Sequence, residues 1–170
     1  MKEKILYYIN SFLIYSIIGF LLETTLKTFF IKDMNNGILY GPWIPVYGIG
    51  SVLIIIIMRF VFNRIKVSRP LKIILLFLFS AIILSTIELI GGILIEKIFG
   101  KIFWDYSDMK FGMGHYISLE MALVWGVMSL VVTYVIKPFI DKIIKKIPSI
   151  ITYLVFITFI MDVVFTFLLK

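Results

Sequence analysis

The sequence contains no cysteine and only one histidine, His115, among its 170 residues. The lack of thiols excludes disulfide bonds, thiolate metal sites and cysteine catalysis, and a single histidine excludes a histidine-rich metal site. Charged residues are scarce at 16% of the chain, whereas 61% of the residues are hydrophobic. A soluble domain of this length has too little interior to hide so much apolar surface. We therefore expect lipid to be the main solvent of this chain.

Long apolar runs divide the chain into five expected membrane spans, because a helix needs about 20 apolar residues to cross a bilayer. The spans cover residues 5–30, 44–62, 71–95, 116–136 and 150–169. We expect a single transmembrane domain, 1–170, folded as an all-α integral membrane helical bundle. A glycine- and proline-rich outer segment precedes the second helix, and an interfacial loop joins the third and fourth. Within that loop, residues 97–103 are expected to form a short interfacial helix.

The lysines and arginines predict the orientation of these spans. Eleven of the 17 flank the amino terminus and the connections between spans 2 and 3 and between spans 4 and 5. Because cytoplasmic loops carry an excess of basic residues, the amino terminus is expected in the cytoplasm and the carboxyl terminus outside. The net charge of +7 is therefore interpreted as a topology signal, and no nucleic-acid partner is expected.

Eight of the ten acidic residues fall on the predicted outer side. Glu88, Gly92 and Glu96 recur every four residues and so share one face of a helix. Glu23 and Glu120 lie within the first and fourth spans. Acids inside a span usually face a partner or a water-filled cavity. One interpretation is therefore an outward-facing acidic pocket that binds a small polar or cationic ligand.

The alternative interpretation is that these acids are satisfied internally. Glu23 and Lys27 have the spacing and order of a favourable ion pair on a helix. Asp162, in the fifth span, is near Thr158 and Thr166 in the sequence and is interpreted as a structural residue that hydrogen-bonds one of them.

The segment YGPWIPVYGIGS, residues 40–51, precedes the second apolar run. Pro42 and Pro45 exclude a helix start before about Ile44, and proline suits the first turn of a helix. Gly48 and Gly50 then permit close approach in that turn. Non-helical backbone at membrane depth requires surrounding protein or a water-filled cavity, so we expect an extended segment that ends at the positive amino terminus of the second span. An ordinary tight turn is the alternative.

Several side chains of the two outer segments are candidate ligand-binding groups. Those of the first segment are Tyr40, Gly41, Pro42, Pro45, Tyr47 and Gly48. Those of the second are Trp104, Asp105, Tyr106 and His115. The aromatic rings either line a pocket or form an interfacial belt, and Asp105 and Asp108 more often cap a turn than bind a metal ion. His115 either relays protons or hydrogen-bonds at the interface. No metal ion and no cofactor is expected.

Three segments of the chain, FLIYSIIGFLLET, GILYGPWIPVYGIG and ELIGGILIEKIFGKIFWDYSD, occur in this order within roughly residues 12–138. Together they are similar to the CmpB family of ABC-transporter permeases. The resemblance implies a small, multi-pass bacterial membrane protein of the permease type. It also implies roles for the motif residues Glu23, Tyr40, Gly41, Pro42, Pro45, Tyr47, Gly48, Glu88, Glu96, Trp104, Asp105 and Tyr106. His115 is a departure, since family members often carry arginine there.

The chain has no G-x-x-x-x-G-K-[ST] loop, so an ABC system would need a separate ATPase subunit on the cytoplasmic side. The leading hypothesis is a transporter or permease component that acts as a homo-oligomer or with partners. One alternative is an accessory, sensory or scaffolding membrane subunit. Another is an intramembrane lipid-modifying enzyme, for which the sequence offers no clear nucleophile or metal set. The basic loops contact either an ATPase or membrane lipids.

Overall fold

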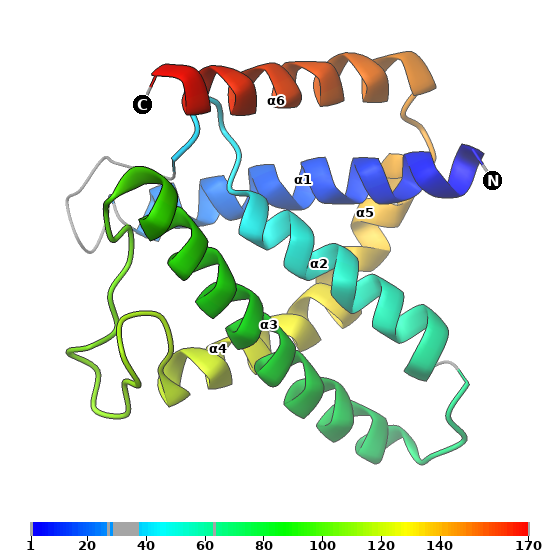
Figure 1. Cartoon of the computed structure of the whole chain (residues 1–170). Coiled ribbons are helices and arrows are strands. Elements are labelled where there is room, and N and C mark those ends of the chain that lie inside the picture. The colour runs from blue at the N-terminus through cyan, green and yellow to red at the C-terminus, as the bar shows by residue number, and fades with distance from the viewer. Residues whose placement is uncertain (1, 27, 29–37, 63, 170) are drawn as a thin grey trace. The chain divides into compact units, whose positions relative to one another are not determined.

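The computed structural model describes residues 2–26, 28, 38–62 and 64–169. Its helices are α1 (Lys2–Leu26), α2 (Pro45–Ile57), α3 (Arg69–Phe99), α4 (Leu119–Val131), α5 (Lys137–Ile144) and α6 (Ser149–Leu169) (Figure 1). One π-helical turn, Met58–Phe62, extends α2, and another, Val132–Ile136, joins α4 to α5. In the described ranges, β-pairing is limited to an isolated bridge between Gly112 and Ser118. The predicted all-α fold is confirmed.

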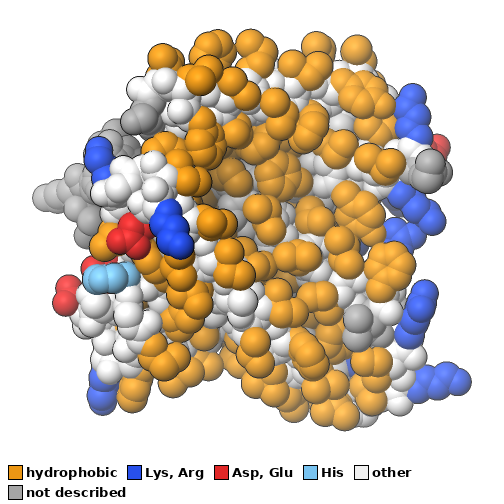
Figure 2. All heavy atoms as spheres, viewed as in Figure 1, with side chains coloured by type: hydrophobic (Ala, Val, Ile, Leu, Met, Phe, Trp, Pro, Cys, Tyr) orange, Lys and Arg blue, Asp and Glu red, His pale blue; other side chains and the backbone are white. Residues whose placement is uncertain are grey.

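Within the described residues, four helical segments are long and apolar enough to cross a membrane. They are Lys2–Thr25, Arg69–Phe99, Leu119–Ile144 and Ser149–Leu169. The remaining predicted span, 44–62, corresponds to a shorter apolar helix, Pro45–Phe60. These helices expose apolar side chains such as Ile82 and Leu154. Hydrophobic side chains cover most of the face shown in Figure 2. Such a surface is suited to lipid, which supports a helical membrane protein.

Two boundaries in the second outer segment differ from the prediction. The expected separate helix over 97–103 is wrong, because residues 97–99 are the last residues of α3. After them, Gly100 adopts a left-handed conformation with φ 64° and donates its N–H to the Glu96 carbonyl, which ends the helix. The fourth helix begins at Leu119 and not at 116, because the Ser118 hydroxyl caps it by accepting the Met121 N–H at 3.1 Å. Two predictions cannot be compared with the structure, because Lys27 of the Glu23–Lys27 ion pair and the end of the first span at residue 30 lie outside the described residues.

The chain forms two compact units, which are described separately. The first unit comprises Met1–Val52 and Phe139–Lys170, and the second comprises Leu53–Pro138. In the first unit, α1 and α6 run alongside each other in the same direction (Figure 1). Its core includes the Phe12 and Phe159 rings in edge-to-face contact, with centroids 5.1 Å apart. A buried hydrogen bond of 3.0 Å, from the Thr152 hydroxyl to the Asn10 side-chain carbonyl, joins the two helices.

The second unit is built mainly from α3 and α4, which pack extensively on each other. Its apolar core contains the buried side chains of Ile54, Phe62, Leu76 and Leu84. At Gly126 of α4, an added Cβ would lie 2.6 Å from the Phe77 ring of α3, so the missing side chain permits this close packing. The same face of α3 continues toward the acidic residues, so helix packing positions them.

Candidate functional site

The glycine- and proline-rich segment lies against α1 in the first unit. Its helix starts at Pro45, as the sequence predicts, and the Ile44 N–H donates to the Ser16 carbonyl at 3.1 Å. A Cβ added to Gly48 would lie 2.2 Å from the Ser16 hydroxyl oxygen and 2.6 Å from the Phe12 carbonyl oxygen. The predicted close approach at Gly48 is therefore present, and the structure adds that α1 is the element that approaches.

Asp162 on α6 anchors the same segment through backbone N–H groups. Its carboxylate accepts hydrogen bonds from the amides of Tyr40 at 3.1 Å and Gly41 at 2.8 Å. The predicted bond from Thr166 is present but long, at 3.5 Å, whereas Thr158 donates to a carbonyl of its own helix. The sequence predicted a structural role for Asp162 with a threonine as its partner, but it did not predict the two amides. Local sequence spacing cannot relate positions 121 residues apart.

Glu23 and Tyr47, two predicted site residues of the first unit, lie together. The Tyr47 hydroxyl donates to the Glu23 carboxylate at 3.3 Å. Gly19, one turn before Glu23, makes room for the ring, since a Cβ there would lie 2.3 Å from the nearest Tyr47 ring carbon. A second helix therefore supplies a hydrogen-bond donor to this acid, as the interpretation of internally satisfied acids expects.

Glu88 occupies the centre of the polar contacts in the second unit. Its side chain, on a residue only 6% exposed, accepts a hydrogen bond from the Tyr106 hydroxyl at 2.6 Å and another from the Trp125 indole N–H at 2.7 Å. Sequence reasoning identified Glu88 and Tyr106 but missed Trp125. The available signal was an indole within an apolar helix, because a buried indole N–H usually finds an acceptor.

Glu96 lies two turns along α3 from Glu88 and contacts the segment that leads into α4. The Tyr116 hydroxyl donates to its carboxylate at 3.0 Å. The Tyr116 ring passes over Gly92, where an added Cβ would lie 2.4 Å from a ring carbon, and it meets the Trp104 ring edge-on at 5.8 Å. Burial, together with the Glu96 contact, raises the pKa of Tyr116.

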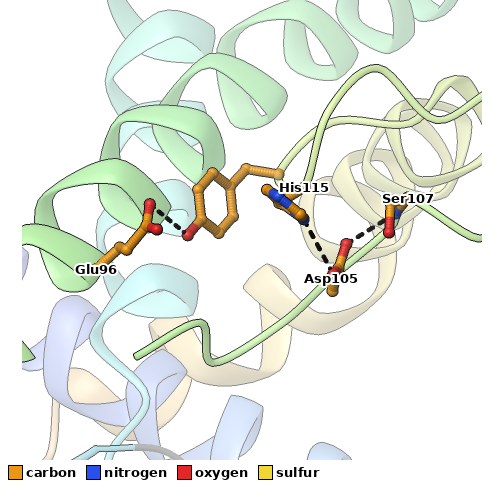
Figure 3. A network of polar contacts seen from close by, with 5 residues as sticks. Glu96, Asp105, Ser107 and His115 are labelled. Atoms are coloured by element: carbon orange, nitrogen blue, oxygen red, sulfur yellow. Dashed lines mark hydrogen bonds and ion pairs between the residues drawn. The ribbon is translucent and has the colours of Figure 1, made fainter. Parts of the chain in front are cut away.

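The loop before α4 contains a second small network. Asp105 accepts the Ser107 N–H at 2.9 Å and lies 3.0 Å from the His115 Nδ1 atom (Figure 3). The Ser107 amide and hydroxyl bonds, followed by His115, hold the pKa of the Asp105 carboxyl below its usual range. Asp105 therefore caps a turn, in agreement with the favoured alternative. Among the described residues, no group of three His, Asp or Glu side chains has the arrangement of a metal site.

Glu120 is connected to this loop through backbone. Its Oε1 atom accepts the Phe111 N–H at 3.1 Å, while its Oε2 atom is buried and has no hydrogen-bond partner in the described part of the chain. Burying a carboxylate oxygen in this way is costly unless a ligand or a water molecule interacts with it.

The two units divide the predicted site residues between them. The first unit contains Glu23, Tyr40, Gly41, Pro42, Pro45, Tyr47 and Gly48. The second contains Glu88, Glu96, Trp104, Asp105, Tyr106, His115 and Glu120. Each acid among them accepts a hydrogen bond either from an aromatic side chain or from a backbone amide, and Asp105 also lies beside His115. One pocket shared by all of them stays a prediction.

Comparison with known proteins places the chain in a family. The searches of curated proteins and of solved structures each gave no match. The model of the CmpB family, with the description "Putative ABC-transporter type IV", matches residues 10–167. This range includes all of the second unit, most of the first and every predicted site residue. It also includes Asp162 and the residues Tyr116 and Trp125 that the structure adds. The chain therefore belongs to the CmpB family of membrane proteins.

Proposed function

We propose that the chain is the membrane-embedded component of a transporter and that it binds a small polar or cationic ligand in an outward-facing acidic pocket. Glu88 is the principal ligand-binding group, supported by Glu96 and Glu120 of the same unit. The chain works as one transmembrane domain with a cytoplasmic amino terminus and an external carboxyl terminus. It assembles with a separate ATPase or with copies of itself.

The burial of Glu88 carries this proposal. A carboxylate inside an apolar helix is expensive, and such residues are functional-site candidates by default. Each of its two hydrogen bonds, at 2.6 and 2.7 Å, offsets about 1.5–3 kcal/mol of that cost. Both of these donors are neutral groups, and their hydrogen bonds orient the two carboxylate oxygens. A small cation gains from such a preoriented carboxylate in a medium of low dielectric constant.

The test is a cation titration of the purified chain in nanodiscs. The unfolding midpoint is followed with K⁺, methylammonium and choline at constant ionic strength, with Na⁺ as the replacement ion. We expect at least one of these cations to raise the midpoint in a saturable way, because a ligand that binds the folded state stabilises it. Glu88→Gln should abolish the rise. Asp108→Asn, which removes an exposed carboxylate of the same unit, should leave it intact.

The principal rival is an accessory or scaffolding subunit whose acids are only structural. The bonds from Tyr47 to Glu23 and from Tyr116 to Glu96 are what this function would require. It predicts that Glu88→Gln lowers the midpoint and that none of the three cations raises it in any variant. That result would contradict the proposed ligand site.

A further inference from the structure

Aromatic rings surround the acidic face of α3 in the second unit. The donor atoms of Tyr106 and Trp125 converge on Glu88. One turn later, the Tyr116 ring covers Gly92, and Trp104 lies against that ring with centroids 5.8 Å apart. Four aromatic side chains, from the loop and from α4, thus gather along two turns of one helix that carry Glu88 and Glu96.

This arrangement satisfies the hydrogen-bond demand of Glu88 from within the protein. Each carboxylate oxygen already accepts a short bond, one from Tyr106 and one from Trp125. The site therefore offers a ligand negative charge and aromatic surface more than further hydrogen bonds. A phenol or an indole that donates to a carboxylate is polarised and its ring becomes more electron-rich, which strengthens the attraction of a cation to the ring face.

Ser85 adds an independent polar feature at the same place. It lies one turn before Glu88 on the same face of α3, and helical side chains lean toward the amino terminus, so the Glu88 side chain extends over the Ser85 turn. Ser85 is only 8% exposed, and its hydroxyl has no hydrogen-bond partner within the described residues. Because an unpaired buried hydroxyl is costly, this position is suited to a ligand that carries an oxygen.

We propose that the ligand is a methylated ammonium compound with a polar oxygen, of the choline class. Its ammonium group lies against the aromatic rings and beside Glu88, and its oxygen pairs with the Ser85 hydroxyl. A quaternary ammonium ion has no N–H groups, so it loses nothing where the carboxylate acceptors are already occupied. This inference rests on the proposed ligand site and narrows it to one chemical class.

Binding of radiolabelled choline to the chain in nanodiscs of phosphatidylethanolamine and phosphatidylglycerol tests the inference. These lipids contain no trimethylammonium group. We expect saturable binding that excess unlabelled choline displaces and that its neutral isostere, 3,3-dimethylbutan-1-ol, does not, because only the positive charge distinguishes the two. Displacement by the isostere to the same extent, or no choline binding, would overturn the inference.

A matched pair of substitutions separates the ring from its hydroxyl. Tyr116→Phe keeps the aromatic face and loses the Glu96 bond, so choline affinity should stay within about 3-fold. Tyr116→Leu removes the face and should weaken binding about 10-fold. Equal affinities in the two variants would overturn the assignment of the ring. If Tyr116→Leu does not fold, the isostere competition in the unaltered chain still decides.

Two further comparisons distinguish the possible outcomes. Replacing phosphatidylethanolamine by phosphatidylcholine tells whether the bound group is free or a lipid headgroup: displacement of labelled choline by the lipid indicates a headgroup, and its absence indicates a free compound. If K⁺ or methylammonium stabilises the chain while choline does not bind, the proposed function stands and this inference fails. If none of the three cations has an effect, both fail.

Discussion

Asp162 on α6 accepts a hydrogen bond of 2.8 Å from the backbone amide of Gly41, 121 residues earlier in the chain. The other carboxylate oxygen accepts the Tyr40 amide at 3.1 Å, so one side chain binds two successive N–H groups. Gly41 is required here for steric reasons, because an added Cβ would lie 2.2 Å from the Trp43 indole nitrogen and 2.9 Å from the Asp162 carboxylate. The non-helical segment is thus fixed to α6 before α2 begins.

Asp162→Asn should therefore loosen the segment. An asparagine offers one carbonyl oxygen in place of two acceptors and points N–H groups at an amide, so we expect a loss of about 1–3 kcal/mol in the free energy of unfolding. Hydrogen exchange at the Tyr40 and Gly41 amides should become faster. Thr158→Ala, which removes an exposed hydroxyl bonded within its own helix, is the control. Unchanged exchange in Asp162→Asn would contradict the anchoring role.

Gly91 and Gly92 provide an internal comparison on α3. Gly91 has open space where a Cβ would be, whereas at Gly92 the Tyr116 ring occupies it. We expect Gly92→Ala to displace the ring, weaken its bond to Glu96 and cost about 1–3 kcal/mol through overpacking. Gly91→Ala should be neutral or stabilise by roughly 0.5–1 kcal/mol, because alanine favours a helix interior. Unfolding titrations of both variants in mixed micelles measure the difference, and equal stabilities would refute the packing account.

Asp105 predicts a pH dependence confined to the loop before α4. Its pKa is lowered first by the Ser107 amide bond, then by the Ser107 hydroxyl and by His115. The ionised carboxylate therefore supports the turn above the ordinary aspartate pKa, and this support is lost as the pH falls through the lowered value. The protection factor of the Ser107 amide, which is its exchange rate relative to an unstructured amide at the same pH, should fall in that acidic range. Asp105→Asn should remove the transition, and Asp108→Asn should keep it. If the transition is still present in Asp105→Asn, a group other than Asp105 causes it.

Membership of the CmpB family predicts a partner for the chain. We expect native mass spectrometry of gently extracted protein to detect an ATPase subunit bound to it. Reversing the charge of the exposed Lys142, Lys145 and Lys146 should weaken that association if the basic loop forms the contact. A homo-oligomer that carries a bound small molecule and no ATPase would indicate an independent carrier or sensor.

The sequence alone determined the features that depend on local composition. Apolar runs of sufficient length determine helices suited to lipid, since backbone polar groups in a bilayer must be satisfied within the helix. Pro45 determines where α2 starts, because proline lacks an N–H and fits the first turn. The close approach at Gly48 also followed from the residue type. The prediction over 97–103 failed because Gly100 terminates α3, and a glycine stop is hard to recognise where apolar residues continue beyond it.

Only the tertiary structure decided which groups meet. Asp162 meets the Gly41 amide, and Trp125 and Tyr106 meet Glu88, although the spans are apolar on nearly all faces and their periodicity does not select one. The sequence showed that the acids need partners, since an unpaired carboxylate in an apolar helix is costly. It did not show that aromatic donors and backbone amides supply them, because hydrogen bonding depends on the packing of segments distant in the chain and not on local spacing.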